Sequence, residues 1–391
     1  MSRHRALLVA AALSFAVAGV GAVGTVGAST GATVPPTDAA AAASSPTASA
    51  PVESTPVESA AVESTWTQIV PGGDCECADG SEFSFWVRQA DPTKVVFFLQ
   101  GGGACFDATT CSFTDGDYSV TADADDNPGL DPGGIFDDSR PDNPFAGWSV
   151  VFVPYCTGDV HLGDAVHEYS PDLTVHHKGL VNGRAAVSYL ADNFPDAEQV
   201  VVIGESAGSV ASPLYGGLVA DALPDAQVTV FGDGSGGYPD VPGVNALIGA
   251  LWGVQNDPPP WPGLVALTPE EWSFPNLWVQ AGLQHPDIVM SRFDYAFDAT
   301  QVFFTGLAGL DGSQLMQLMD DNEARIESDG VTQHSYTAPG DDHTLVRKDE
   351  FYAMTVNGTA LTDWVTDLIN GVDVPDVHCE DCQPPTPTTT G

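Results

Sequence analysis

One stretch of the sequence decides the fold: Val200-Val201-Val202-Ile203-Gly204-Glu205-Ser206-Ala207-Gly208-Ser209. Its first four residues are β-branched and apolar, a pattern that predicts a fully buried strand. A Gly-x-Ser-x-Gly pattern follows directly, and the small residues from Ala207 to Leu223 predict a helix. A strand, a tight turn and a helix in this order present a serine hydroxyl at the tip of the turn. We therefore expect Ser206 to be a nucleophile; the alternative is a Gly/Ser turn with no chemical role.

The neighbours of this serine have predicted roles of their own. The turn is tight and strained, so a Cβ at Gly204 or Gly208 would clash with the adjoining strand or helix. The amide of Ala207 would point at the oxyanion that develops when the serine attacks a carbonyl group.

A second glycine run follows a predicted buried strand at Lys94–Leu99 and reads Gln100-Gly101-Gly102-Gly103-Ala104-Cys105. In a hydrolase, such a loop lets the backbone approach the substrate and aim amides at its carbonyl oxygen, which completes an oxyanion hole. A simple connecting loop is the alternative. Cys105 and Cys111 enclose five residues, so a disulfide between them would brace this loop.

The N-terminal part of the chain predicts export. A basic start precedes an apolar run from Ala6 to about Val23, and small residues follow, which is typical of a secretory signal peptide over residues 1–28. The run is too short and too rich in Gly and Ala for a membrane anchor. Residues 29–65 are mostly Ala, Ser, Thr, Pro, Val and Glu and predict a disordered linker, as do residues 383–391. The folded domain is expected at residues 66–382, and the protein outside the cell, free or at its surface.

The charge balance excludes some classes of partner. The chain has 53 acidic and 11 basic residues, a formal net charge of −42, and the acidic residues are scattered over the whole domain. This indicates a highly charged, soluble surface, as in proteins adapted to salt. It argues against nucleic-acid binding, which needs a basic face, and against docking on an anionic membrane. We expect a monomer with no stable membrane insertion.

Seven cysteines predict disulfides in an exported protein. Cys75 and Cys77 lie near one end of the predicted domain and Cys379 and Cys382 near the other, so a staple joining the two ends is one expectation. The rival interpretation is a zinc knot, which export disfavours. The odd count leaves one thiol free or paired elsewhere.

Metal sites receive little support from the sequence. Asp115–Asp142 is acidic, but its spacing lacks the rest of a calcium loop, so a solvated loop is favoured. His161, His167, His176 and His177 fit no standard set of metal ligands. We expect no metal and no cofactor.

The order of predicted elements indicates a mixed α/β fold. Strands at Trp148–Val153, Gln227–Phe231 and about Asp287–Phe293 alternate with helices, such as Lys178–Phe194. This alternation predicts a mostly parallel central sheet flanked by helices, an α/β-hydrolase-like architecture. Residues 238–280 break the pattern and are read as a cap near the mouth of the site. They are rich in Pro and hold four tryptophans, which would line the mouth or belong to the core.

A serine nucleophile needs an imidazole to take its proton and a carboxylate to orient that imidazole. The expected chain order is serine, aspartate, histidine, and His343 is the histidine candidate. Three aspartates qualify for the acid: Asp233, Asp294 and Asp298. Their structural alternatives are a turn for Asp233, a plain loop for Asp294 and a helix N-cap for Asp298.

Six short motifs occur in a fixed order along the chain: Cys77-Ala78-Asp79-Gly80-Ser81, Phe98-Leu99-Gln100-Gly101-Gly102-Gly103-Ala104-Cys105, Pro154-Tyr155-Cys156, Gly204-Glu205-Ser206-Ala207-Gly208, Asp298-Ala299-Thr300-Gln301 and His343-Thr344-Leu345. Through these motifs the chain resembles, from about Cys77 to Leu368, the pectin acetylesterase/Notum family of secreted carboxylesterases. The resemblance implies a catalytic triad of Ser206, His343 and Asp298, because the family's acid precedes a glutamine by three residues. It also implies oxyanion-hole amides at Gly102, Gly103 and Ala207, and disulfides pairing Cys105 with Cys111 and Cys77 with Cys156. The family often has Trp where Ala104 stands here, and the cap differs from that of better-known members.

The sequence thus predicts a secreted serine carboxylesterase. By resemblance alone, its substrate would be an O-acetyl ester on a polysaccharide such as pectin. One alternative is an esterase for other acyl groups, on a lipid or a small aliphatic ester. Another is a non-catalytic carbohydrate-binding surface protein, which would have no need of a nucleophile, a base and an oxyanion loop together.

Overall fold

The computed structural model describes residues 65–114, 118–380 and 382–383. The predicted signal peptide, nearly all of the predicted linker and residues 384–391 lie outside the described residues. None of the described helices is both long and apolar enough to cross a bilayer.

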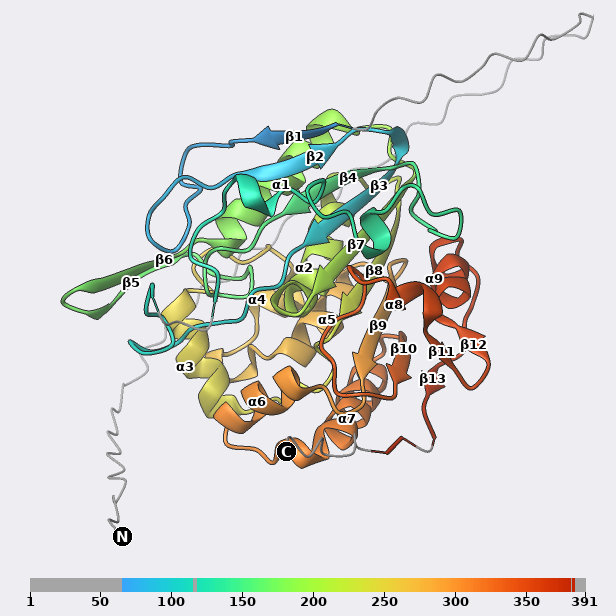
Figure 1. The fold of residues 1–391 in the computed structure, drawn as a ribbon. Coiled ribbons are helices and arrows are strands. Elements are labelled where there is room, and N and C mark those ends of the chain that lie inside the picture. Colours follow the sequence, from blue (N-terminus) through green and yellow to red (C-terminus); the bar gives the residue numbers. More distant parts are fainter. Residues whose placement is uncertain (1–64, 115–117, 381, 384–391) are drawn as a thin grey trace, which may run out of the picture. The chain divides into compact units, whose positions relative to one another are not determined.

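A nine-stranded sheet forms the centre of the described region, with strand order β1-β2-β4-β3-β7-β8-β9-β10-β13 (Figure 1). From β4 to β13 all neighbours run parallel, whereas β1 and β2 are antiparallel additions at one edge. The predicted mostly parallel sheet is therefore confirmed. The strands are β1 Trp66–Ile69, β2 Phe85–Arg88, β3 Asp91–Leu99, β4 Trp148–Val153, β7 Gln199–Glu205, β8 Gln227–Asp233, β9 Val289–Tyr295, β10 Gln333–Ala338 and β13 Val377–His378.

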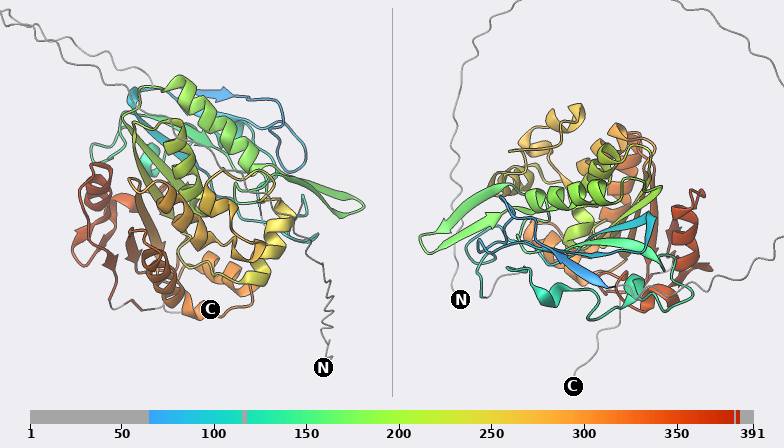
Figure 2. Two further views of the ribbon diagram at one scale, coloured as in Figure 1. Left: turned by 180° about the vertical axis from the view of Figure 1, so that it is seen from behind. Right: turned by 90° about the horizontal axis from the view of Figure 1, so that it is seen from above.

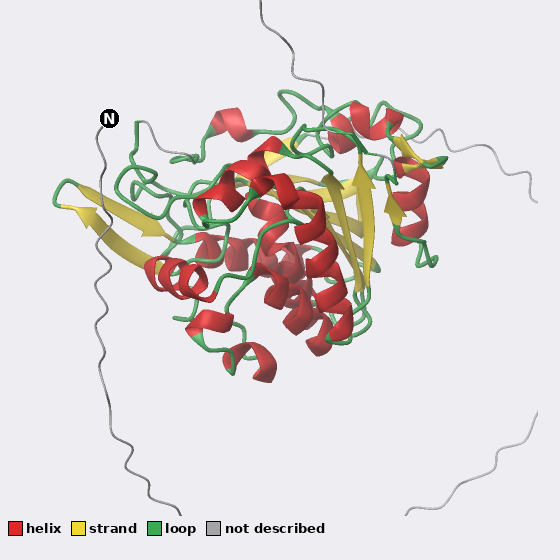
Figure 3. Ribbon diagram, turned by 90° about the horizontal axis from the view of Figure 1, so that it is seen from below, coloured by secondary structure: helices red, strands yellow, loops and turns green. Residues whose placement is uncertain are grey.

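Helices cover both faces of the sheet (Figures 2 and 3). On β3, Phe97 packs into the core under α1 and α2, while its neighbour Phe98 packs into the core on the opposite face with Trp364 of α9. This alternation follows from the two-residue period of a strand, and it explains why a continuous apolar run is needed for a strand buried on both faces. The helices of the two layers are α1 Gly179–Asn193, α2 Ala207–Ala222 and α5 Phe274–Gln284 on one face, and α8 Glu350–Ala353 and α9 Leu361–Ile369 on the other.

Some elements were not expected from the sequence. β10 contains buried polar residues and lacks the continuous apolar run of the other central strands, which is why its sequence did not predict a strand. An antiparallel hairpin, β5 Ala165–Ser170 with β6 Leu173–His177, projects from the sheet (Figure 1). Two helices lie between β9 and β10, α6 Ala299–Leu307 and α7 Leu315–Ser328, and α6 begins directly after Asp298, as the N-cap interpretation of that residue predicts.

The segment read as a cap contains α3 Pro242–Trp252, α4 Pro262–Val265 and the 3-10 turn η3 Pro269–Glu271. α5 begins inside the range and packs against α2, so its residues belong to the helical layer. All four tryptophans of the segment are buried: Trp252, Trp261, Trp272 and Trp278.

Three disulfides join described cysteines. Cys77–Cys156 and Cys105–Cys111 are the pairs that the family resemblance implies. The expected staple between the ends of the domain is wrong, because Cys379 pairs with Cys382 instead. The physical reason is the strand order: β13, which precedes Cys379, lies at one edge of the sheet, and the β1–β2 pair that flanks Cys75 lies at the other. Cys75 is left as a buried free thiol.

Candidate active site

Ser206 occupies a strained turn between β7 and α2. Its φ of 52° and ψ of −115° lie outside the regions that non-glycine residues normally adopt, and such strain concentrates at functional sites. Its own amide donates to the carbonyl of Asp233 at 2.8 Å, which ties the turn to the next strand. A Cβ on Gly204 would overlap the carbonyl of Gly208, and a Cβ on Gly208 would overlap that of Leu99. The two glycines are thus required by the packing, as predicted.

The glycine loop after β3 reaches the same turn. A Cβ on Gly101 would lie 2.8 Å from the Cβ of Ser206, so only glycine allows this approach. Gly103 has a φ of 81° and lines the same pocket as Ser206 and Ala207. Gly102 lies against the Tyr155 ring and does not line the pocket. Gly103 and Ala207 therefore line the pocket together with Ser206, whereas Gly102 precedes Gly103 in the loop and lies outside the pocket lining.

His343 lies in the segment after β10 and is held by Asp298. The ring donates from Nδ1 to Oδ2 of Asp298 at 2.7 Å. Nε2, the other ring nitrogen, is buried without a hydrogen-bond partner among the described residues. A base needs this arrangement, because a proton fixed at Nδ1 leaves Nε2 free to accept another.

Asp298 also caps α6, so the two interpretations of this residue hold together. Its Oδ1 accepts from the amides of Thr300 at 2.9 Å and Gln301 at 3.0 Å. Its Oδ2 accepts from the Gln301 side chain at 3.0 Å in addition to the histidine. Two oxygens allow one carboxylate to fix the helix start and the imidazole at once.

The other two aspartates hold different groups. Asp294 forms a buried ion pair with Arg292 at 2.6 Å and accepts from the amide of Gly236. Asp233 accepts through Oδ2 from the amides of Leu345 at 2.7 Å and Val346 at 2.9 Å. Asp233 therefore anchors the backbone two residues after His343, and Asp298 is the carboxylate that contacts the ring.

Burial and charge act in opposite directions on the titrating groups. Burial lowers the pKa of His343. The hydrogen bond and charge of Asp298, together with the charges of Asp233 and Glu205, raise this pKa by more than burial lowers it, so it lies above its ordinary value. Burial also raises the pKa of Asp233 to about 7, although the amides of Leu345 and Val346 oppose this shift.

These shifts predict the effect of Asp233→Asn. Removing the carboxylate removes one charge that raises the pKa of His343, so the acid limb of the kcat/KM profile should move to lower pH. A carboxyl whose folded-state pKa lies above its unfolded value makes stability fall as pH rises through that window, here from about pH 4 to pH 7. The melting temperature of the variant should fall less over this window than that of the parent. Unchanged profiles of both kinds would contradict the coupling.

Two contacts of the site were missed in the sequence. Oε1 of Glu205 accepts from the amide of Gly101 at 3.4 Å and from the Arg347 guanidinium at 3.2 Å, which links the turn, the glycine loop and the histidine segment. His161 donates from Nε2 to the carbonyl of Gln100 at 2.8 Å and so holds the start of the glycine loop. His161 and Val160 both have positive φ, a strain that no sequence pattern reveals.

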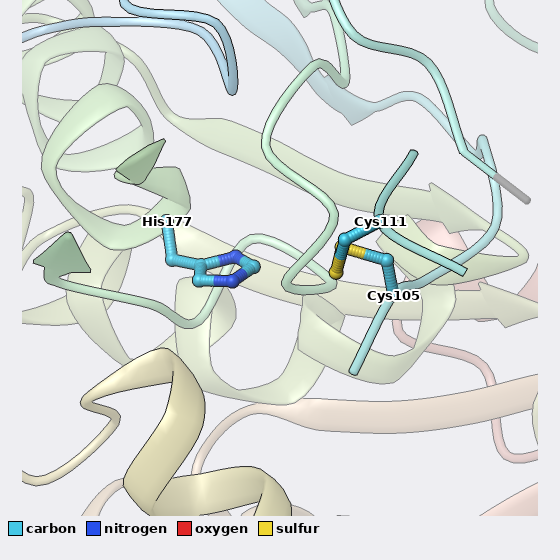
Figure 4. A group of neighbouring side chains, drawn as sticks. All are labelled: Cys105, Cys111 and His177. Carbon is cyan, nitrogen blue, oxygen red and sulfur yellow. A yellow bond between two sulfur atoms is a disulfide. The ribbon is translucent and has the colours of Figure 1, made fainter. Parts of the chain in front are cut away.

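The four histidines considered as metal ligands have other partners. His176 donates to Glu76 at 2.7 Å, and His167 packs against Tyr169. His177 lies near Cys105 and Cys111 (Figure 4), but these cysteines form a disulfide and supply no thiolate, the form that binds zinc.

Ser206 lines a pocket of about 210 Å³. Its walls come from the glycine loop, the loop after β4, the start of α2, α3 with the residues before it, the start of α5, and α6. The described residues that line the pocket include no Asp, Glu, Lys, Arg or His. Most of the lining residues are aliphatic or aromatic. Ala104 is one of them, so the position where the family often has Trp opens into this space.

A mixed α/β protein with a serine on a strained turn, an imidazole fixed by a carboxylate and a nearby glycine loop has the arrangement of a hydrolytic enzyme. Residues 56–246 match the model of the pectinacetylesterase family. The match confirms the resemblance to the pectin acetylesterase/Notum family, and at this level it supports a carboxylic ester hydrolase for acetylated polysaccharide. Members of the family are typically extracellular, which agrees with the three disulfides. No curated protein matches the chain.

The matched segment includes the glycine loop and Ser206 and ends before Asp298 and His343. For Asp298 and His343, the structure shows the hydrogen bond that joins the two side chains.

Proposed function

We propose that the protein is a secreted serine carboxylesterase with an α/β-hydrolase-like fold, in which Ser206, His343 and Asp298 form the catalytic triad. The observation that carries this proposal is the 2.7 Å hydrogen bond from His343 Nδ1 to the buried Asp298, with Nε2 left unpartnered. Most buried polar side-chain atoms have a hydrogen-bond partner, so an unpartnered Nε2 beside a carboxylate-bound Nδ1 suits a proton acceptor.

In the proposed mechanism, the Ser206 hydroxyl attacks the ester carbonyl while His343 takes its proton at Nε2. The amides of Gly103 and Ala207, with Gly102 beside them, stabilise the oxyanion of the tetrahedral intermediate, each donor contributing about 10²–10³ in rate. The intermediate expels the alcohol, which receives the proton from His343. Water then attacks the acyl-enzyme by the same route and releases the carboxylic acid.

A labelling experiment tests the nucleophile directly. A fluorophosphonate probe should add covalently to the peptide that contains Ser206, and mass spectrometry of the digested protein would locate it. The raised pKa of His343 predicts that labelling slows as the pH falls through that pKa, because the protonated ring accepts no proton. Labelling at another serine, or none, would contradict the proposed mechanism.

The family supports an O-acetyl ester on a polysaccharide as the substrate, and this is our first proposal for it. The pocket favours a second candidate, an ester with a longer apolar acyl chain. An acetyl group presents a single methyl, whereas the pocket of about 210 Å³ has apolar walls and no charged side chain among its described residues.

A chain-length series separates the two substrates. Burying each further methylene contributes about 0.8 kcal/mol, so kcat/KM should rise about fourfold per methylene while the pocket still has room. p-Nitrophenyl acetate, butyrate, hexanoate and octanoate would be compared below their solubility limits, beside acetate release from acetylated pectin. A steady decline from acetate to octanoate would favour the O-acetyl substrate and contradict the apolar one.

A further inference from the structure

Two helices beside the pocket carry no charged residue. α3 reads PGVNALIGALW and α6 reads ATQVFFTGL. The rest of the chain is densely acidic, with a formal net charge of −42. Exposed helices of such a protein are expected to carry acidic side chains, so both helices need a separate explanation.

α6 is oriented with its polar residues inward. Gln301 and Thr305 are completely buried, whereas Phe303 is 50% exposed and Leu307 is 48% exposed. Leu310, just after the helix, is 38% exposed. A helix at the surface of a soluble protein normally buries its apolar stripe. On α6 the capping and site contacts of Asp298 and Gln301 fix the inner face, and the apolar residues are left outside.

α3 is also poorly buried. Trp252 is its only buried residue, and Leu247 is 60% exposed. Figure 1 shows α3 and α6 near one another at one side of the described region, away from α9. Both helices also contribute residues to the lining of the same pocket, so their exposed residues can act as one surface.

This surface is continuous with the pocket. Leu247 of α3 and Leu307 of α6 are both exposed and both line the pocket that contains Ser206. Tyr238 also lines the pocket, and its ring lies 6.4 Å from that of Phe304 on α6 and 5.9 Å from that of Phe274 on α5. The pocket thus reaches the solvent between the exposed apolar residues of the two helices.

We propose that the exposed face of α3 and α6 docks on the apolar surface of a water-insoluble neutral ester, from which one acyl chain enters the pocket. The proposal rests on the carboxylesterase function proposed above, with its second substrate candidate, the ester with a longer apolar acyl chain, and names the physical state of that substrate. An anionic surface is disfavoured, because the two helices offer no cation and the whole chain is strongly negative. A second copy of the chain is disfavoured as the occupant of this face, because it would cover the mouth of the pocket.

The test measures docking without turnover. Ser206→Ala protein would be mixed with a trioctanoylglycerol emulsion coated with phosphatidylcholine, and the bound fraction measured by flotation. Adding Phe303→Ser and Leu310→Ser should weaken binding at least about tenfold, since two half-exposed apolar side chains lose their contact. Val372→Ser is the matched control, because Val372 is 49% exposed and follows α9. It should leave binding unchanged.

The outcomes separate docking from chemistry. Neither Phe303 nor Leu310 lines the pocket, so on a serine-intact chain their double variant should hydrolyse soluble p-nitrophenyl butyrate at the parental rate. Replacing half of the coat with an anionic phospholipid should reduce binding. Equal binding by parent and double variant would overturn the docking proposal alone. A parent dimer that dissociates on these substitutions in sedimentation would also overturn it, in favour of a second copy. Absent turnover of both p-nitrophenyl acetate and p-nitrophenyl butyrate would overturn the esterase function alone.

Discussion

Ser206→Ala is expected to reduce ester hydrolysis by about 10⁶-fold while leaving the fold intact, because members of a catalytic triad fail as a unit. No hydrogen bond of the Ser206 side chain caps α2, so its removal costs little stability. The serine is held by its backbone, through the amide bond to Asp233 and the glycines on either side. Hydrolysis of p-nitrophenyl butyrate and a thermal melt measure the two effects separately.

Ser209→Ala supplies the matched control for this experiment. Ser209 lies one turn further along α2, is buried and bonds the hydroxyl of Ser235 at 2.6 Å. Its removal should cost about 1 kcal/mol of unfolding free energy and leave turnover largely unchanged. If Ser206→Ala kept more than about a tenth of the parental activity, Ser206 would not be the nucleophile.

The strands around the serine could be predicted because their residues are apolar without interruption. Trp148–Val153 forms β4 with the predicted bounds, and the Val200–Ile203 run lies within β7. β10 could not be found in this way, because its buried polar residues bond to other side chains. Ser335, for example, bonds Glu323 and His378.

The shape of the pocket could not be predicted from the sequence, for a different reason. Its walls come from six separate segments of the chain, and only the folded protein brings them together. For α6, periodicity shows which residues share a face and leaves open which face points inward. The buried contacts of Gln301 with Asp294 and Asp298 decide that question, and they invert the usual orientation.

The choice among three aspartates was also open in the sequence, and the alternatives considered for Asp298 proved compatible. A cap and a histidine partner were weighed as rivals, whereas Oδ1 serves the helix and Oδ2 the ring. Asp294 is only four residues away, yet its position on β9 directs it to Arg292.

Asp298→Asn is therefore expected to reduce kcat by about 10⁴-fold, the loss known for this change in a serine protease triad. The asparagine amide would face Nδ1 of His343 with a donor, or with an oxygen that no longer carries charge. The ring would adopt the tautomer with its proton on Nε2, and a protonated Nε2 accepts nothing from Ser206. The remaining oxygen still caps α6, so the melting temperature should change little.

Asp294→Asn is the matched comparison, because its expected result is the reverse. Among the residues that the structure describes, it leaves the buried Arg292 with only Glu323 as an ion-pair partner at 2.8 Å, and breaking a buried pair costs about 3–5 kcal/mol. Activity per folded molecule should persist, since no hydrogen bond joins Asp294 to His343 among the described residues. Measured on both variants, kcat should therefore fall only in Asp298→Asn and the melting temperature only in Asp294→Asn. A stable, inactive Asp294→Asn beside an active Asp298→Asn would assign the triad acid to Asp294 and would contradict the alignment of Asp298 with the acid of the family.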